Sequence, residues 1–212
     1  MSTRLVHVTR RTYDATRRKE ASDERRESVL EAARELLASE GDEAFSIDAI
    51  ARRAGVSRMT IYNLFGSKAG LLEALFDSLA ARGEFGTMGR IYGLPDAERA
   101  LAELVALFGR FWTASRVAHR RLRAAAIADE ELATAIDARN ERRRRGLAVL
   151  TKRILAAREI EARPRAVGDI VRALFMLTSF DTFDTLAGPD RTPAQVTPMV
   201  QRLAVAVFET AL

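Results

Sequence analysis

The stretch FSIDAIARRAGVSRMTIYNLFGSKAGLLEALF, residues 45–76, decides the fold because it alternates helix starts with helix stops. Ser46 and Ser57 each precede a run of helix-forming residues, and a serine at this position accepts a hydrogen bond from a free N–H of the first turn. Gly55 and Gly66 follow the two runs, where a helix ends most easily at a residue with a permissive backbone. The spacing therefore predicts two short helices joined by a tight turn, which is the layout of a helix-turn-helix.

The second of these short helices has an unusually polar outer side. Its apolar residues Ile61, Leu64 and Phe65 fit a buried face. The outside and edges carry Arg58, Met59, Thr60, Tyr62 and Asn63. Ser67 then predicts the cap of a further helix, and Lys68 lies in its first turn, where a positive charge opposes the helix dipole. A phosphate at that helix end would offset the conflict, because exposed N–H groups and a lysine suit one anion.

Helices predicted on both sides of this stretch complete an N-terminal domain over residues 23–82. The preceding helix is expected from Asp23 to Ser39 and to stop at Gly41. Its apolar residues Val29, Ala32, Ala33, Leu36 and Leu37 recur at the spacing of one helix face. The following helix, to about Arg82, carries Leu71, Leu72, Leu75, Phe76 and Leu79.

The composition favours an all-α protein. Of the 212 residues 48% are hydrophobic, five are proline, and no stretch alternates apolar and polar residues. The absence of cysteine excludes disulfides and thiolate metal sites. With two histidines besides, the chain has poor material for an enzyme, and we expect no catalytic residues, metal or cofactor. We find no apolar run long enough for a membrane span and no secretory leader, so we expect no membrane partner and a cytoplasmic location.

Residues 1–22 are predicted to form a basic, flexible arm. Residues 1–20 carry six arginines and lysines against Asp14 and Glu20, a balance of +4, and show no helical period. Two interpretations are open: a solvated tail, or an arm that touches DNA phosphates or a minor groove.

The segment GEFGTMGRIYGLPD, residues 83–96, is predicted to be a connection that opens a second domain, residues 83–212. Three of its glycines are three residues apart, but no strand precedes them and the Gly-Lys-Ser/Thr ending of a phosphate loop is missing. The rest of the chain is helical in pattern, with segments expected at about 96–114, 116–127, 129–158, 165–187 and 193–211.

The last two predicted helices, 165–187 and 193–211, are apolar on more than one face. The first carries Ile170, Val171, Leu174, Phe175, Met176, Leu177, Phe180 and Phe183, and the second carries Leu203, Val205, Val207 and Phe208. Such helices are covered on two sides. They are either central in the monomer or part of a homodimer interface; the sequence favours a homodimer with a four-helix seam.

Large rings of the second domain are candidate ligand contacts. These are Phe108, Phe111, Trp112, Phe175, Phe180 and Phe183. They form either a ligand pocket or ordinary core. Asp181 and Asp184 lie among them, and two roles stay open: contact with a polar or cationic ligand, or pairing with arginines across a dimer. The arginine-rich stretches 116–123 and 142–145 are predicted to be solvated, salt-bridged faces.

Taken together, residues 45–76 resemble the DNA-binding region of the tetracycline-repressor (TetR) family. The features that carry the resemblance are Ile50–Ala51, Ala54–Gly55–Val56–Ser57, Thr60–Ile61–Tyr62, Phe65, Ser67–Lys68 and Leu71–Leu72. The resemblance implies an N-terminal helix-turn-helix domain and a larger C-terminal helical domain for ligand binding and dimerisation.

By position, the resemblance also implies residue roles. Thr60 and Tyr62 correspond to contacts with backbone phosphate, and Lys68 to the lysine that binds phosphate at the start of the fourth helix. Arg58, Met59 and Asn63 correspond to the part that faces base edges, while Ser46 and Ser57 cap helices and approach phosphates. The implied function is a ligand-responsive regulator, usually a repressor.

We therefore expect a homodimeric regulator that binds a palindromic operator in double-stranded DNA and is released by a small-molecule effector. Two copies related by a two-fold axis would place recognition helices in successive major grooves, about 34–36 Å apart. The alternative is a helical sensor or interaction module without DNA binding. The presence of Thr60, Tyr62 and Lys68 argues against it, because such a module does not need them.

Overall fold

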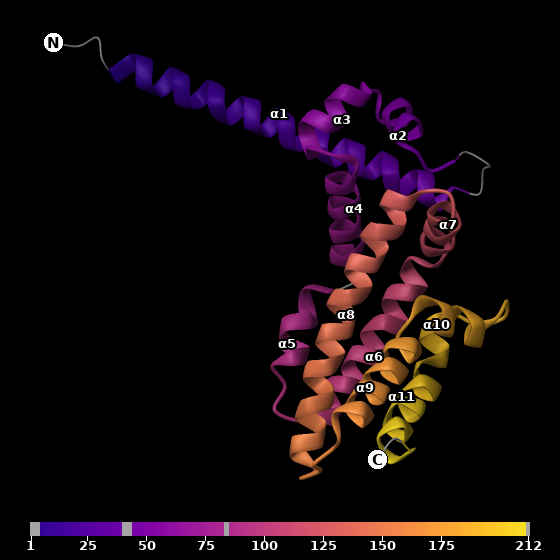
Figure 1. Cartoon of the computed structure of the whole chain (residues 1–212). Coiled ribbons are helices and arrows are strands. Elements are labelled where there is room, and N and C mark those ends of the chain that lie inside the picture. Colours follow the sequence, from indigo (N-terminus) through magenta and orange to yellow (C-terminus); the bar gives the residue numbers. More distant parts are fainter. Residues whose placement is uncertain (1–4, 40–43, 83–84, 211–212) are drawn as a thin grey trace. The chain divides into compact units, whose positions relative to one another are not determined.

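The computed structural model describes residues 5–39, 44–82 and 85–210, with side chains from residue 16 onward, and the regular elements in these ranges are helices (Figure 1). The all-α prediction is confirmed. The chain divides into two compact units between Leu75 and Phe76, inside α4 (Lys68–Arg82), whereas the sequence placed the boundary at residue 83. The second half of α4 makes contacts within the second unit, because Arg139 pairs with Asp77 and lies over the ring of Phe76.

Unit 1 contains α1 (Leu5–Ala38), α2 (Ile47–Ala54), α3 (Arg58–Phe65) and the first part of α4. Apolar residues from all four helices are buried, among them Val29, Ala33, Leu37, Ile50, Ile61, Phe65, Leu71 and Leu75. The predicted caps are confirmed. Ser46 and Ser57 cap α2 and α3, and Gly55 and Gly66 follow them with positive φ.

The start of α1 differs from the expected flexible arm. α1 begins at Leu5, so residues 5–22 are helical and continue into the packed part of the helix. These residues contain neither glycine nor proline, and extending a helix that is already anchored adds a hydrogen bond for each residue fixed. The predicted stop at Gly41 lies outside the described residues.

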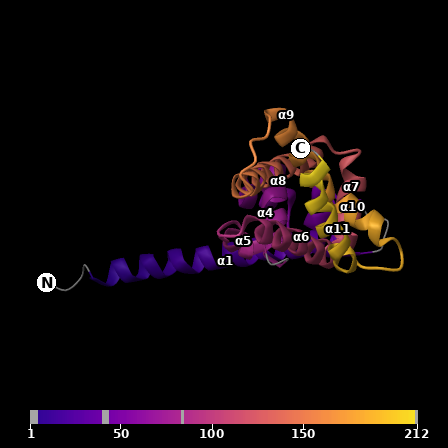
Figure 2. The same cartoon turned by 90° about the horizontal axis from the view of Figure 1, so that it is seen from below.

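Unit 2 contains the remaining helices. They are η1 (Phe85–Thr87), α5 (Met88–Tyr92), α6 (Ala97–Ala114), α7 (Arg116–Ala126), α8 (Glu130–Ala157), α9 (Pro164–Leu177), α10 (Phe180–Ala187) and α11 (Pro193–Thr210). α11 packs along α6, and α8 packs against α9 (Figure 2). Their facing sides form one core that includes Leu104, Phe108, Leu150, Leu174, Phe183 and Phe208.

Two parts of unit 2 differ from the predictions. Within the expected connection 83–96, residues 85–92 form η1 and α5, because Ile91 is buried and Arg153 donates a hydrogen bond to the carbonyl of Tyr92 at 2.7 Å. The predicted single helix 165–187 is broken into α9 and α10. The break occurs because Ser179 caps α10, its hydroxyl accepting a hydrogen bond from the backbone N–H of Thr182 at 3.2 Å.

A capping box precedes the last helix. Gln195 accepts a hydrogen bond from the backbone N–H of Thr192 at 2.8 Å, and α11 begins at Pro193. No helix in the described part of the chain is long and apolar enough to cross a membrane.

Candidate nucleic-acid interface and ligand region

Helix α3 is started and stopped by local hydrogen bonds. The Ser57 hydroxyl accepts from the backbone N–H of Thr60 at 3.1 Å, and the two hydroxyls lie 2.9 Å apart. At the other end the N–H of Gly66 donates to the carbonyl of Tyr62 at 2.7 Å. Before α3, Gly55 has φ 66°, a left-handed conformation that lets the chain turn sharply from α2 into α3. The length of α3 is therefore set by its own sequence.

The inner side of α3 is fixed to the rest of unit 1. Ile61 is fully buried and Phe65 is 9% exposed. Arg26 of α1 donates to the carbonyl of Leu64 at 2.8 Å, and its guanidinium lies 4.2 Å from the centroid of the Phe65 ring. Arg26 thus satisfies a free carbonyl at the end of α3 and covers its last aromatic ring. The sequence analysis missed this residue, although it lies one helical turn before the buried Val29 and Leu30.

The outer side of α3 presents the predicted base-contacting residues. Met59 is 65% exposed, and Asn63, one turn later, is also exposed. Arg58 is exposed and pairs with Asp48 of α2, with Nε 3.3 Å from the carboxylate. A hydrogen bond with Tyr62, and then the charge of Asp48, raise the pKa of Arg58 above its ordinary value. Asp48 orients Arg58 and was not predicted, because the pair connects two helices.

The remaining predicted DNA contacts lie at helix starts or on the flank of α3. The Ser46 hydroxyl accepts from the N–H of Ala49 at 3.2 Å, so it caps α2 as predicted. The Ser67 hydroxyl accepts from the N–H of Gly70 at 3.0 Å, and the half-buried Lys68 is the first residue of α4. Thr60 and Tyr62 are half-buried. All eight predicted DNA-binding residues therefore belong to unit 1, six of them on α3 or at its cap.

Most of the predicted ligand-binding rings form a single buried cluster. Trp112 stacks on Phe108 with centroids 5.7 Å apart and contacts Phe111 at 4.7 Å and Phe180 at 5.7 Å. Phe85 and His119 complete the cluster. Phe183 is fully buried in the same core. Phe175 has a different environment, because its half-buried ring lies beneath the guanidinium groups of Arg143 and Arg144.

His119 is held in an apolar environment at the edge of this cluster. Its ring is 4.6 Å from that of Trp112, and its Nδ1 lies 3.0 Å from the carbonyl oxygen of Ser115. Burial lowers the pKa of His119 from 6.5 to about 4, and the contact with Ser115 acts in the opposite direction. The imidazole is therefore neutral at physiological pH.

Asp181 and Asp184 pair with arginines of the same chain, which is neither of the two roles left open by the sequence. Asp184 accepts from Nε of Arg116 at 2.5 Å and of Arg120 at 2.9 Å, and Asp181 accepts from Arg123. Burial acts to raise the pKa of Asp184, but the hydrogen bonds from Arg120 and Arg116 outweigh it and place the pKa below its ordinary value. The arginines of α7 thus form the salt-bridged face that was predicted, and α10 supplies the acids.

Arg143 corrects the prediction that residues 142–145 are a solvated face. Arg144 and Arg145 are exposed, but the side chain of Arg143 enters the protein. Its Nη1 donates to the carbonyl of Thr178 at 2.8 Å, and burial, followed by the charge of Arg144, lowers its pKa to about 10. The apolar surface of the Phe108 and Phe175 rings provides the reason, because a guanidinium is stabilised over aromatic faces.

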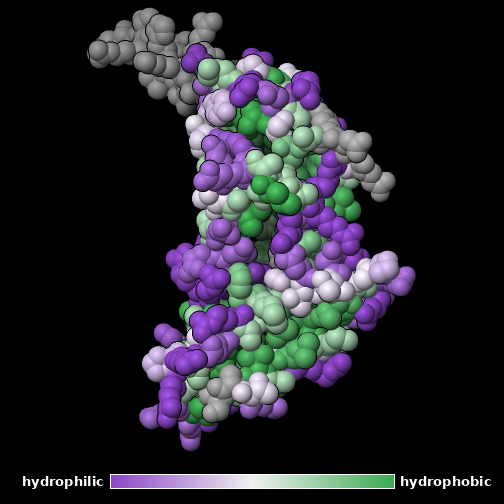
Figure 3. All heavy atoms as spheres, turned by 45° about the vertical axis from the view of Figure 1, so that its right-hand side comes forward, coloured by the Kyte–Doolittle hydropathy of each residue, from purple (hydrophilic) through white to green (hydrophobic). Residues whose placement is uncertain are grey.

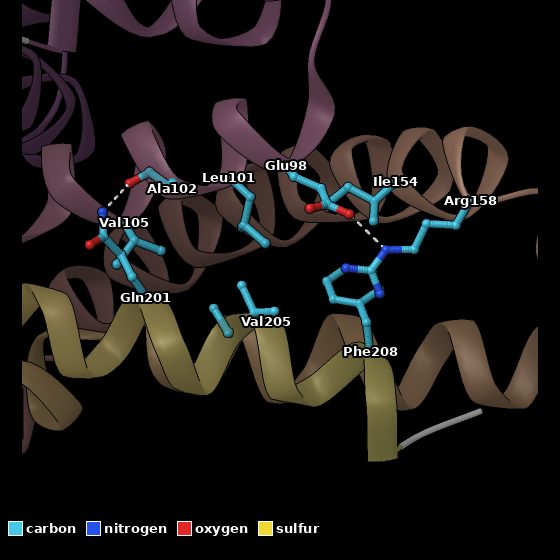
Figure 4. A pocket seen from close by; sticks show the side chains of 10 residues that line it. Glu98, Leu101, Ala102, Val105, Ile154, Arg158, Gln201, Val205 and Phe208 are labelled. Carbon is cyan, nitrogen blue, oxygen red and sulfur yellow. Dashed lines mark hydrogen bonds and ion pairs between the residues drawn. The ribbon is translucent and has the colours of Figure 1, made fainter.

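A small cavity of about 50 Å³ lies elsewhere in unit 2, between α6, α8 and α11 (Figure 4). Its lining is mostly apolar, with Leu101, Val205 and Phe208 among it, and an ion pair of Arg158 with Glu98 at 2.7 Å lies at one side. Gln201 donates to the carbonyl of Ala102 at 2.9 Å. An apolar cavity of roughly 150 Å³ accommodates benzene, so this one has room for a smaller group. None of the six predicted aromatic residues lines it.

Apolar side chains are exposed on two of the helices predicted to form a dimer seam. Met176 of α9 is 57% exposed, and Leu203 and Val205 of α11 are 43% and 44% exposed. Figure 3 brings the side of α10 and α11 forward and shows hydrophobic side chains gathered on this part of unit 2. Among the described residues, no group of three or more His, Cys, Asp or Glu side chains is arranged to hold a metal.

Comparison with known proteins relates the sequence of most of unit 1's packed helices to a family. Residues 29–75 match the model of the bacterial regulatory proteins of the tetR family. The chain carries a TetR-family DNA-binding domain. This recognition confirms the resemblance stated from the sequence, and the matched residues contain α2, α3 and most of α1's packed part.

Similar proteins include two transcriptional regulators and one solved TetR structure. The chain is 47% identical over 57 residues to the helix-turn-helix (HTH)-type transcriptional regulator AlkX of Mycobacterium tuberculosis, which is 27% of either chain. It is 33% identical over 89 residues to the regulator EthR of Mycolicibacterium smegmatis, covering 42% of this chain and 41% of EthR. A TetR transcription regulator from Haloarcula marismortui superposes with a TM-score of 0.64 at 19% identity, over 88% of this chain and 97% of the other. The sequence matches thus span less than half of the two relatives, and the structural match concerns the fold.

Proposed function

We propose that this protein is a homodimeric, effector-responsive transcriptional regulator that binds a palindromic operator, most simply as a repressor. The observation that carries the proposal is α3 itself. It is capped at both ends, fixed at the back by Ile61, Phe65 and Arg26, and polar on the outside. A short rigid helix with this distribution of residues suits insertion into a major groove.

Within the groove, each predicted residue has a distinct role. Arg58 donates two hydrogen bonds to a guanine, and Met59 packs on a thymine methyl. Asn63, on the same exposed side, supplies an amide for a base edge. Thr60, Tyr62 and Lys68 bind backbone phosphates and hold the register, and Ser46 and Ser57 approach phosphates from the starts of α2 and α3. Asp48 releases Arg58 when the base contact forms.

The test is selection of bound fragments from a random pool of double-stranded DNA at about 0.15 M salt. Wild-type protein is compared with a Tyr62→Ala, Lys68→Ala variant and with Arg99→Ala, which removes an exposed charge from unit 2. We expect a palindromic consensus for wild type and for Arg99→Ala, and its loss in the double variant. Weak binding without a consensus, reduced equally in the double variant and in Arg99→Ala, would contradict the proposal. It would favour a sensor that does not bind DNA specifically.

The proposed dimer uses the exposed apolar residues of α9 and α11. Contact with a second copy gives these apolar residues a lower free energy than contact with water, and two copies would form a four-helix seam. Leu203→Glu should convert the dimer to a monomer in sedimentation experiments. Val149→Glu, at a residue of similar exposure on α8, is the matched control and should leave the dimer intact. Identical masses for both variants would exclude this surface.

The effector is proposed to act through α8 and α4. Arg139 of α8 pairs with Asp77 and lies over Phe76, both on α4, and α4 continues without interruption from the residues of unit 1. An effector that binds differently to two arrangements of these helices will change operator affinity by its differential affinity. Arg139→Gln should therefore reduce the effect of an effector on operator binding while leaving effector binding itself within about threefold. Unchanged release of the Arg139→Gln variant from its operator would contradict this route.

A further inference from the structure

Arg143 differs from its neighbours on α8 in what surrounds its charge. The guanidinium carbon lies 4.2 Å from the centroid of the Phe175 ring and 5.7 Å from that of Phe108. Its hydrogen-bond acceptors are neutral: the Thr178 carbonyl at 2.8 Å and the Asn140 side-chain oxygen at 3.3 Å. Its Nε is buried and has no hydrogen-bond partner among the described residues.

Arg153 of unit 2 also donates to carbonyls, those of Tyr92, Leu94 and Pro95, but two other partly buried arginines have a carboxylate partner. Arg116 pairs with Asp184 at 2.5 Å, and Arg158 pairs with Glu98 at 2.7 Å. The charged groups that act on Arg143 are Arg144, which repels it, and Asp181, which attracts it. The carboxylate of Asp181 is already paired with Arg123. A buried charge with neutral acceptors and one unsatisfied N–H is costly, and a bound anion would offset both costs.

We propose that Arg143 binds the carboxylate of an apolar organic acid, whose apolar part packs on the aromatic cluster around Phe108, Trp112 and Phe175. The inference rests on the proposed function, since it names the chemical class of the effector. A carboxylate fits because its two oxygens match the planar fork of a guanidinium. The rings on both sides select an apolar body.

The hydrogen bonds around Thr178 let Arg143 leave the Thr178 carbonyl for a carboxylate at little cost in free energy. Its carbonyl accepts from Arg143 and also from the indole N–H of Trp112 at 3.2 Å. When a carboxylate takes the guanidinium, the carbonyl keeps the bond from Trp112, so no buried acceptor is left unsatisfied. Arg143 and Phe175 are half-buried rather than enclosed, and the exposed Arg144 lies 4.3 Å from the Phe175 centroid. The positive charge of Arg144 thus lies beside that of Arg143 and attracts anions to the site.

The site is also placed to act on the rest of the protein. Arg139 lies one helical turn before Arg143 on α8 and holds Asp77 of α4. Movement of Arg143 toward a ligand would therefore shift α8, which is connected to α4 through the pair of Arg139 with Asp77. The neutral His119 and the paired Asp184 add no free charge to the aromatic cluster.

The test uses the single tryptophan of the chain, Trp112, as a reporter. Its fluorescence is titrated in the full-length protein with decanoate and 4-phenylbutyrate, and with decanol and 4-phenylbutanol as neutral partners, up to about 1 mM. The variants are Arg143→Gln, Arg143→Lys and, as the matched control, Arg145→Gln, which removes an exposed charge from the same helix. Circular dichroism melting verifies that each variant is folded.

We expect wild type to bind at least one acid more tightly than its alcohol. Arg143→Gln should weaken acid binding about tenfold to a hundredfold, the loss of a charge-assisted hydrogen-bond pair, while Arg145→Gln retains most of it. If Arg143→Gln does not fold, Arg143→Lys decides, because it keeps the charge and loses the fork, and it should lose at least about tenfold.

Equal affinity for acid and alcohol, no binding of any probe, or acid binding unaffected at residue 143 would overturn the inference. The operator selection is performed without any acid, so its outcome is independent. An operator bound by a protein that ignores acids leaves the proposed function standing and removes only the carboxylate site.

Discussion

Replacement of His119 by phenylalanine should remove a pH-dependent part of the stability of unit 2. The wild-type ring is packed against Phe111 and Trp112, with centroids 5.1 and 4.6 Å apart, and burial lowers its pKa from 6.5 to about 4. In the unfolded chain the imidazole takes up a proton as the pH falls below 6.5, whereas in the folded protein it does so only near pH 4. The unfolded state thus binds more protons between these values, and stability must fall as the pH falls.

The size of this effect follows from the difference between the two pKa values. About 2.5 units at about 1.4 kcal/mol each give a total loss of about 3.5 kcal/mol, of which roughly 3 kcal/mol is lost between pH 7 and pH 4, and the loss levels off below that. Asp184 acts in the same direction but at lower pH, because its lowered pKa delays its protonation. Urea unfolding followed by Trp112 fluorescence measures the free energy at each pH. The reasoning is refuted if His119→Phe keeps the wild-type slope between pH 6.5 and 4.5.

Three further substitutions test the interface and the packing. Ser57→Ala removes the cap of α3 and should cost about 1 kcal/mol in urea unfolding followed by far-ultraviolet circular dichroism, with a matching loss of operator affinity. Arg26→Met keeps the stem but leaves the Leu64 carbonyl without its donor, so unit 1 should lose about 1–2 kcal/mol and bind the operator less tightly although no DNA contact is removed. Gly109→Ala would place a methyl group 2.1 Å from the Thr197 hydroxyl, so α6 and α11 must shift and thermal unfolding should reveal a loss of about 1–3 kcal/mol.

Unit 1 was predictable because its signals are local. A serine cap acts within three residues, a glycine stop acts on the turn beside it, and both can be seen in the sequence 45–76. Ser57 and Gly55 therefore appear in the structure where the sequence placed them. Arg26 and Asp48 were missed because they act across helices, on Leu64 and Arg58, and no spacing along one helix reveals such a pair.

Unit 2 was predicted less well, because more of its structure depends on contacts between helices. Residues 142–145 are all arginines, so the sequence does not distinguish them. Only the packing of α8 against α9 determines that Arg143 enters the protein while Arg144 stays exposed. The extension of α1 to Leu5 followed from propagation of a helix rather than from an apolar stripe. Arg143 illustrates that a charged residue has no fixed environment until its neighbours are known.

The break between α9 and α10 explains why unit 2 has a polar acceptor at the edge of its aromatic core. In a continuous helix the Thr178 carbonyl would accept from the backbone N–H of Thr182, four residues later. The Ser179 hydroxyl accepts from that N–H instead, at 3.2 Å, so the Thr178 carbonyl is available to side chains. Trp112 and Arg143 both use it, one as a neutral donor and one as a charged donor. A single serine cap thus holds the indole in place and gives a buried guanidinium its acceptor, so the helix break and the proposed carboxylate site depend on one local hydrogen bond.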